Sequence, residues 1–302
     1  MTKIAVEIAG IKMKNPVLAA SGCYGFGREY NQLYDISRLG GIMTKGTTLE
    51  PKLGNPTPRL AETPAGMLNS IGLQNPGVDK VILEEIPWLR TFDVACIVNI
   101  SGYSIEEFEI IAERLDGVSG VDGLEVNISC PNVKGGGMAF GTDPHTAALV
   151  VKRVKAKTKL PLIVKLSPNV TAITEIAKAV ENAGADAVSL INTLLGMVID
   201  IKQRKPILAN TMGGLSGPAV KPIAVRMVYQ VYTAVEIPII GMGGITTFED
   251  AVEFMLAGAS AVAIGAGNFT DPFAPLKVID GLEKWLEQEG IKDVREIIGG
   301  CK

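Results

Sequence analysis

Eight short apolar runs recur along the chain, and a stretch of helical periodicity follows each of them. The runs are Pro16–Ala20, Gly41–Thr44, Cys96–Ile100, Leu124–Ile128, Leu162–Leu166, Ala187–Ile191, Ile237–Gly241 and Ala261–Gly265. Alternation of strands and helices predicts a parallel sheet, because a crossover helix joins each strand to the next. Eight such units predict an α/β protein with a closed (β/α)₈ barrel, in which residues 1–302 form one domain.

Two similar segments support this repeat. Ala183-Gly-Ala-Asp-Ala-Val188 and Ala257-Gly-Ala-Ser-Ala-Val262 each predict a helix end, a glycine beyond it and the entry to the next strand. Before the first run, Ile4–Ile11 predicts an N-terminal hairpin. Segments 46–76 and 194–219, which leave the second and sixth strands, are long and rich in glycine and proline. Long loops in such barrels belong to the C-terminal face, where active sites lie.

Charge and cysteine content argue against several classes of protein. The net charge of −3 gives no electrostatic footprint for nucleic acid or an anionic membrane. No apolar run approaches the roughly 20 residues of a transmembrane helix, so we predict a soluble cytoplasmic protein. The four cysteines are far apart and have no histidine at ligand spacing, so no metal site is expected. A GxGxxG fingerprint after the first strand is also missing, which argues against a Rossmann NAD site.

The predicted strands end in polar residues that would all point to one place. They are Ser21, Lys45, Asn99, Asn127, Lys165, Asn192 and Thr193. The last two strands end instead in Gly241-Met-Gly-Gly244 and Gly265-Ala-Gly267, where backbone N–H groups can approach a phosphate closely. The sequence therefore predicts an amide-lined pocket for a flat polar ligand beside a phosphorylated cofactor.

Cys130 is the candidate for chemistry among the cysteines. It follows an apolar strand within Val126-Asn-Ile-Ser-Cys-Pro-Asn132 and precedes the glycine run 135–137, which predicts a reactive thiol in a loop. The other three cysteines, Cys23, Cys96 and Cys301, are expected to be small buried hydrophobic residues.

The remaining polar residues divide into site and structural candidates. Lys165 lies inside an apolar strand, where a barrel leaves little room for its side chain to reach water, so we expect a partner anion; the same argument applies to Lys45. The only histidine, His145, lies in Gly141-Thr-Asp-Pro-His145, which predicts a capped helix start with Pro144 in its first turn and a surface position for the histidine. Three asparagines beside prolines are expected to be turn residues: Asn15, Asn55 and Asn169.

These motifs resemble the dihydroorotate dehydrogenase family, and within it the class 1B catalytic subunits. The resemblance runs essentially end to end. It is carried by Asn127-Ile-Ser-Cys-Pro-Asn-Val-Lys134, Gly135-Gly-Gly137, Phe140-Gly-Thr-Asp-Pro144 and Asn69-Ser-Ile-Gly-Leu73.

The resemblance implies an FMN-containing barrel that oxidises dihydroorotate to orotate in pyrimidine biosynthesis, with Cys130 as the catalytic base. FMN would contact Ser21, Lys45, Gly46, Asn99, Asn127, Lys165, Ile191, Gly217, Gly243, Gly244, Gly265 and Ala266. The substrate would contact Lys45, Asn69, Ser70, Ile71, Gly72, Leu73, Asn127, Asn132, Asn192 and Thr193.

The residue chemistry agrees with these roles. Orotate has a carboxylate, ring carbonyls and ring N–H groups; asparagines supply both donors and acceptors, and Lys45 suits the carboxylate. Oxidation removes a proton from C5 and a hydride from C6, so a base must face the side of the ring opposite the flavin. Lys165 would be a second catalytic residue that stabilises the negative charge of the reduced flavin.

Class 1B enzymes pair with an iron–sulfur flavoprotein that carries FAD, a [2Fe-2S] cluster and the NAD site, which implies a heterotetramer built on a dimer of this chain. Three alternatives remain open from the sequence: a class 1A homodimer that reduces fumarate, an FMN barrel that acts on another dihydropyrimidine such as dihydrouracil, and a phosphate-binding barrel with lyase, isomerase or purely binding function.

Overall fold

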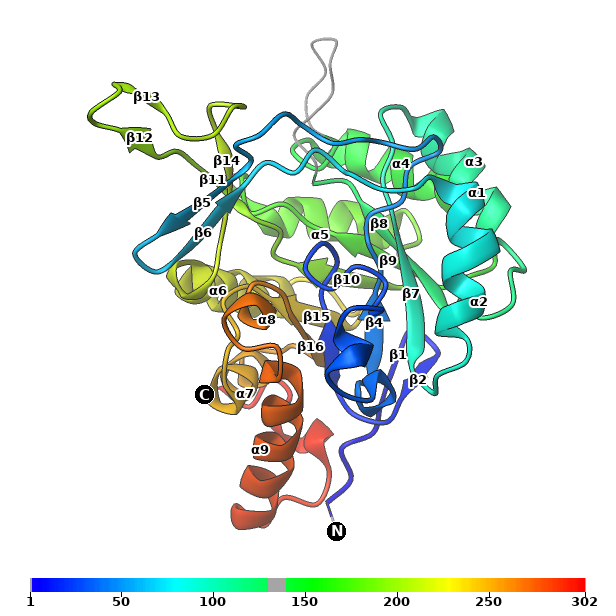
Figure 1. Ribbon diagram of the computed structural model, residues 1–302. Helices are drawn as coiled ribbons and strands as arrows, with labels where there is room; N and C mark the ends of the chain where they lie inside the picture. Colours follow the sequence, from blue (N-terminus) through cyan, green and yellow to red (C-terminus); the bar gives the residue numbers. More distant parts are fainter. Residues whose placement is uncertain (1, 130–139, 302) are drawn as a thin grey trace.

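A computed structural model describes residues 2–129 and 140–301, so Cys130, Asn132 and the glycine run 135–137 lie outside the described residues. Within them, parallel strands close into an eight-stranded barrel (Figure 1). The barrel strands are β3 (Val17–Ala19), β4 (Gly41–Met43), β7 (Ala95–Ile100), β8 (Gly123–Asn127), β9 (Leu162–Lys165), β10 (Ala187–Leu190), β15 (Ile239–Met242) and β16 (Ala261–Ile264). Each pairs with the next, and β16 pairs with β3, which confirms the predicted (β/α)₈ barrel.

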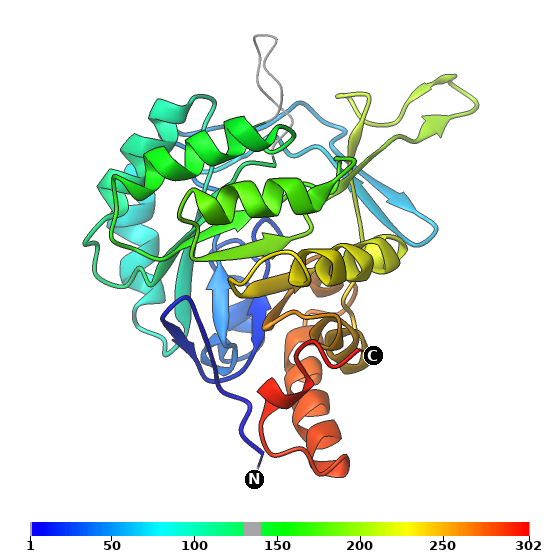
Figure 2. The same ribbon diagram turned by 180° about the vertical axis from the view of Figure 1, so that it is seen from behind.

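In the described part of the chain, six α-helices of nine residues or more pack on the outside of the barrel (Figures 1 and 2). They are α3 (Ile105–Leu115), α4 (Pro144–Lys155), α5 (Ile173–Asn182), α6 (Lys221–Tyr232), α7 (Phe248–Leu256) and α9 (Ala274–Gln288). α4 begins as predicted: Asp143 is its N-cap and accepts a hydrogen bond of 2.7 Å from the amide of Thr146, and His145 is exposed. α5 and α7 end just before Gly184 and Gly258, whose φ angles are positive as the repeated segments require.

Shorter helical segments fill the other connections. α1 (Val78–Lys80), a π-helical turn (Val81–Glu85) and α2 (Ile86–Leu89) follow one another without a break, and α8 (Gly267–Thr270) follows β16. The expected helix after the first strand is absent from the described residues, because β3 and β4 are joined only by 3₁₀ turns at Tyr30–Gln32 and Ile36–Arg38. Gly22, Gly25 and Gly27 in this connection have positive φ angles, which interrupt a helix.

The strand bounds lie within one residue of the predicted runs, except at the start of the seventh strand. The seventh strand begins at Ile239 rather than Ile237, because Pro238 has no N–H group to donate to a neighbouring strand. The N-terminal hairpin is also displaced: β1 (Val6–Ile8) and β2 (Ile11–Met13) turn at Ala9 and Gly10. A Cβ atom on Gly123 would lie 2.7 Å from the side chain of Ile11, so the hairpin packs tightly against the start of β8.

The two long loops pair with each other at the C-terminal end of the barrel. β5 (Leu60–Thr63) and β6 (Gly66–Asn69) from the first loop join β11 (Leu194–Gly196) and β14 (Gly213–Ser216) from the second in one antiparallel sheet. Between β11 and β14, a small hairpin of β12 (Ile199–Asp200) and β13 (Lys205–Pro206) projects from the body (Figure 1). The loops therefore form a structured wall beside the predicted site.

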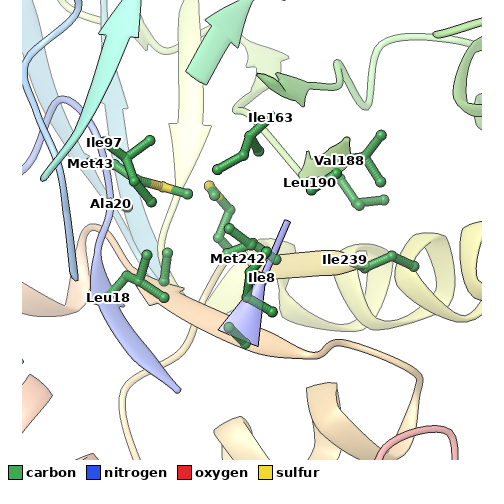
Figure 3. Packing of buried hydrophobic residues seen from close by; sticks show 14 of the residues in the cluster. Ile8, Leu18, Ala20, Met43, Ile97, Ile163, Val188, Leu190, Ile239 and Met242 are labelled. Atoms are coloured by element: carbon green, nitrogen blue, oxygen red, sulfur yellow. The ribbon is translucent and has the colours of Figure 1, made fainter. Parts of the chain in front are cut away.

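The barrel interior is apolar along most of its length. Leu18, Ile97 and Ile163 from three strands are fully buried in one cluster (Figure 3). The interior becomes polar near the strand ends, where several polar side chains are buried: Asn99, Glu125, Lys165 and Ser189. None of the helices in the described part of the chain is long and apolar enough to span a bilayer.

Candidate active site

The predicted strand-end residues come together at the C-terminal end of the barrel. Asn99 lies in β7, Asn127 is the last residue of β8 and Lys165 is the last residue of β9. Parallel pairing places Asn127 beside Lys165. Ser21, Lys45 and Asn192 each follow the last residue of their strand by two positions. Because all eight strands are parallel, these residues share one rim of the barrel.

The Cys23 thiol is influenced by the charges of two lysines of this rim. Burial raises the pKa of the Cys23 thiol, and the positive charges of Lys165 and Lys45 act in the opposite direction. Both ammonium groups therefore lie near the same sulfur.

Cys23 is half-buried and Cys96 is buried, but Cys301 is exposed, so the expectation that Cys301 is a buried hydrophobic residue is wrong.

Lys165 has the partner anion that its position predicted. Its side chain is almost completely buried, and its Nζ lies 3.7 Å from Oε2 of Glu125. Glu125 is fully buried in β8. Its position within an otherwise apolar run concealed its role in the sequence, although a charge inside a buried strand is itself a signal, because such a charge needs partners.

A short hydrogen-bond chain joins two of the predicted substrate amides. Asn192 donates from Nδ2 to Oγ of Ser129 at 2.6 Å, and Ser129 donates from Oγ to Oδ1 of Asn127 at 2.7 Å. Ser129 immediately precedes Cys130 and was not among the predicted site residues. The hydroxyl of Ser129 thus fixes Asn127 and Asn192 relative to each other at the entrance to the Cys130 segment.

The predicted carboxylate loop, Asn69 to Leu73, is held by asparagine side chains on both sides. Asn55 donates to the carbonyl of Ser70 at 2.9 Å, and Asn75 donates to the carbonyl of Leu73 at 2.7 Å. The Oγ atom of Ser70 is buried without a hydrogen-bond partner in the part of the chain that the structure describes. The loop therefore keeps a defined shape and leaves a hydroxyl group available to a ligand.

Asn15 and Asn169 lie in bends, as predicted for turn residues, whereas Asn55 lies in neither a turn nor a bend. Asn15 accepts a hydrogen bond from the amide of Val17 at the start of β3. Asn169 donates to the carbonyl of Thr193 at 3.0 Å and accepts from the amide of Leu195 at 2.9 Å. Asn55 and Asn169 thus hold the segments that carry Ser70 and Thr193.

The glycines predicted to contact a cofactor lie against the same rim. A Cβ atom on Gly46 would come within 3.0 Å of Oδ1 of Asn99, and one on Gly243 would come within 3.2 Å of Ile191. Gly244 has a φ of +81°, and a Cβ atom there would lie 2.9 Å from the carbonyl oxygen of Gly217. Close packing at these positions leaves backbone, rather than side chains, facing the space above the strands.

An ion-pair network holds the loop that follows β15. Burial alone would raise the pKa of Asp250, but hydrogen bonds from Lys221 and from Thr246 and Thr247 lower it below its usual value. Asp250 accepts from Nζ of Lys221 at 2.7 Å and from the amide of Thr246 at 2.8 Å. This network joins the start of α6 to the loop that carries Gly243 and Gly244, and no sequence motif pointed to it.

The donor and acceptor set suits a flat heterocycle with a phosphate. Oδ1 of Asn99 is buried with no donor among the described residues, so it can accept a hydrogen bond from a ring N–H group. Gly46 packs against this oxygen, and Lys165 and Asn127 lie on the same rim. Ser21 and Ala266 lie on the same rim, at the ends of β3 and β16. No group of three or more His, Cys, Asp or Glu residues within 2–129 and 140–301 has the arrangement of a metal site.

Comparison with known proteins agrees with this geometry. A family model described as dihydroorotate dehydrogenase matches residues 3–286. A relative from Geobacillus sp. (strain WCH70) is 59% identical over 299 residues, which cover 99% of this chain and 96% of the relative. One from Desulforamulus reducens is 60% identical over 298 residues, covering 99% and 98%. Both carry the name "Dihydroorotate dehydrogenase B (NAD(+)), catalytic subunit".

Proposed function

The chain belongs to the dihydroorotate dehydrogenase family, and we propose that it oxidises dihydroorotate to orotate in de novo pyrimidine biosynthesis, as the catalytic subunit of an NAD⁺-linked enzyme. The observation that carries the proposal is the meeting of Asn99, Asn127, Lys165 and Asn192 at one end of a closed barrel. Near-full-length similarity to catalytic subunits of this name supports it.

The cofactor proposed for this chain is FMN, in a domain formed by residues 1–302. When bound, FMN would accept the hydride that leaves C6 of dihydroorotate. Oδ1 of Asn99 has no donor among the described residues, which supports a ring with an N–H group, and the backbone around Gly243 and Gly244 supports a phosphate. The full proposed set is Ser21, Lys45, Gly46, Asn99, Asn127, Lys165, Ile191, Gly217, Gly243, Gly244, Gly265 and Ala266.

The substrate would be held by amides and by a cation. Asn127 and Asn192 offer donors and acceptors to the ring carbonyls and N–H groups, and Lys45 with the Asn69 to Leu73 loop offers positive charge and donors to the carboxylate. Thr193 and Asn132 complete the proposed set. Cys130 would take the proton from C5, and the Ser129 hydrogen bonds support this role because they fix the residue immediately before it.

We also propose an electron-transfer partner. The relatives are named as catalytic subunits, and a subunit implies another chain. The partner would be an iron–sulfur flavoprotein with FAD and a [2Fe-2S] cluster, in a heterotetramer built on a dimer of this chain. The cytoplasm is the proposed compartment, because it keeps thiols such as the free Cys23, Cys96 and Cys301 reduced.

Anaerobic titration tests the proposed reaction. The purified chain, reconstituted with FMN, is expected to show the absorbance of an oxidised flavin and to bleach when dihydroorotate is added. Dihydrouracil serves as the matched control, because it has the same ring without the carboxylate. Bleaching by dihydrouracil alone would contradict the substrate, and a chain that binds no FMN would contradict the oxidoreductase.

Lys165→Ala is expected to lower the reduction potential of the bound flavin and to slow its reduction by dihydroorotate. The reason is that the variant removes a buried positive charge from the place where the ring would gain negative charge. Spectroelectrochemical titration measures the potential. Lys284→Ala, which changes an exposed lysine on α9, is the control and should behave as wild type. An unchanged potential in Lys165→Ala would place this lysine outside the site.

A further inference from the structure

Glu125 is a buried acid that none of the proposed cofactor or substrate contacts uses. Its side chain is fully inaccessible in β8, inside the barrel. Oε2 accepts from Nδ2 of Asn99 at 2.5 Å, and Oε1 accepts from Oγ of Ser189 at 2.6 Å. Nζ of Lys165 lies 3.7 Å from Oε2. One carboxylate thus joins side chains from β7, β9 and β10.

A buried carboxylate such as that of Glu125 gives the fold little or no net stability, so its presence calls for another explanation. Removing a carboxylate from water is expensive, and a well-packed apolar residue in its place is often neutral or stabilising. The three partners compensate Glu125 but do not explain its presence. Two of them, Asn99 and Lys165, belong to the proposed flavin site, so a task at that site is the natural explanation.

The hydrogen bond to Glu125 determines which way the Asn99 amide faces. Because Nδ2 donates to the carboxylate, Oδ1 must point away from it, toward the space beside Gly46. That oxygen has no donor among residues 2–129 and 140–301. Without an acceptor at position 125, the amide could turn around and present its NH₂ group to the ligand instead.

We propose that Glu125 is a positioning residue for the flavin: it orients the Asn99 carbonyl toward the cofactor, holds the Lys165 ammonium, and reduces the net positive charge beside the ring. The proposal rests on the FMN site proposed above. It goes beyond that site, because it assigns control of the flavin's affinity and potential to a residue that does not touch it.

Glu125→Gln has nearly the same shape and removes the charge. Gln can accept from Asn99 only if its NH₂ group faces Ser189, whose hydroxyl then accepts, and its bond to Asn99 is neutral instead of charge-assisted. We expect the dissociation constant of FMN to rise about 3- to 10-fold, because the weaker bond to the glutamine side chain holds the Asn99 carbonyl less firmly in place. The flavin potential should rise, because Lys165 loses its counter-charge; this is opposite in sign to the effect of Lys165→Ala. FMN binding to the apoprotein is measured by calorimetry, and the potential by photoreduction without dihydroorotate.

Two further variants separate charge from hydrogen bonding. Ser189→Ala keeps the carboxylate and should leave the potential near that of wild type. Glu125→Asp keeps the charge but withdraws it from Asn99, so FMN affinity should fall while the potential stays near normal. Glu125→Asp also serves if Glu125→Gln does not fold, since normal FMN affinity in Glu125→Asp would overturn the proposal. An unchanged or lower flavin potential in Glu125→Gln would also overturn the proposal.

The controls distinguish this inference from the function on which it rests. If wild-type protein binds no FMN, the proposed function fails. If wild-type protein binds FMN and is bleached by dihydroorotate, but the Glu125 variants match it in affinity and potential, only the role of Glu125 fails.

Discussion

Cys130→Ala is expected to lower the rate of flavin reduction by dihydroorotate by a factor of about 10² to 10⁴, the usual effect of losing a general base. Orotate binding should change little, because the amides of Asn127 and Asn192 and their link through Ser129 remain. Anaerobic stopped-flow measures the first quantity and orotate titration of the oxidised flavin the second. The matched control is Cys301→Ala, which removes an exposed thiol at the end of the chain.

Cys23 is the rival base, because it lies near both lysines of the site. Burial raises the pKa of its thiol, which makes Cys23 a poor proton acceptor at neutral pH. In Cys23→Ala, the rate of flavin reduction by dihydroorotate should therefore stay within a few-fold of the wild-type rate. In Cys130→Ala it should not. A near-normal rate of flavin reduction in Cys130→Ala, together with a severe loss of rate in Cys23→Ala, would identify Cys23 as the base instead of Cys130.

The pH dependence gives the same assignment a second check. A free thiol has a reference pKa of about 8.5, and only the thiolate accepts a proton, so reduction by wild type should accelerate as the pH rises toward that value. Cys130→Ser should stay slow across this range and gain activity only at higher pH, because a hydroxyl is a far weaker acid than a thiol.

The barrel could be predicted because its strands are short, apolar and regularly spaced. Glycines such as Gly184 and Gly258 also mark where helices end before the next strand. The connection after β3 could not, since an apolar pattern alone does not distinguish 3₁₀ turns from an α-helix. Pairing of the two long loops through β6 and β14 also lay beyond the sequence, because it joins segments far apart in the chain.

The candidate site was predicted where a polar residue ends an apolar strand, as Asn127 and Lys165 do. It was incomplete for residues that lie inside a strand or next to a more conspicuous residue. Glu125 was concealed by apolar neighbours, and Ser129 by the adjacent Cys130. Their roles follow from hydrogen bonds to other strands, and strand periodicity does not specify which side chains meet across a barrel.

The second large effect concerns where the electrons go. The purified chain alone, loaded with FMN, should oxidise dihydroorotate with an artificial acceptor and show no measurable reduction of NAD⁺. Its sequence has no GxGxxG fingerprint after the first strand and no two cysteines at CxxC spacing, so it offers neither a Rossmann site for NAD⁺ nor clustered thiolates for a [2Fe-2S] relay. Adding an iron–sulfur flavoprotein partner should change NAD⁺ reduction from none to steady turnover.

Fumarate distinguishes this assembly from a self-sufficient homodimer. A class 1A enzyme passes its electrons to fumarate without a partner, so the purified chain is assayed with dihydroorotate and fumarate, and separately with dihydroorotate and NAD⁺, each with and without the flavoprotein. We expect turnover only with NAD⁺ and the partner together. Cys130→Ala in the same complex should slow NAD⁺ reduction by a factor of about 10² to 10⁴, because electrons reach NAD⁺ only after dihydroorotate has reduced the FMN. Robust fumarate reduction by the chain alone would contradict the NAD⁺-linked assembly, yet the Cys130 chemistry would stand, since the oxidant reacts after the base has acted.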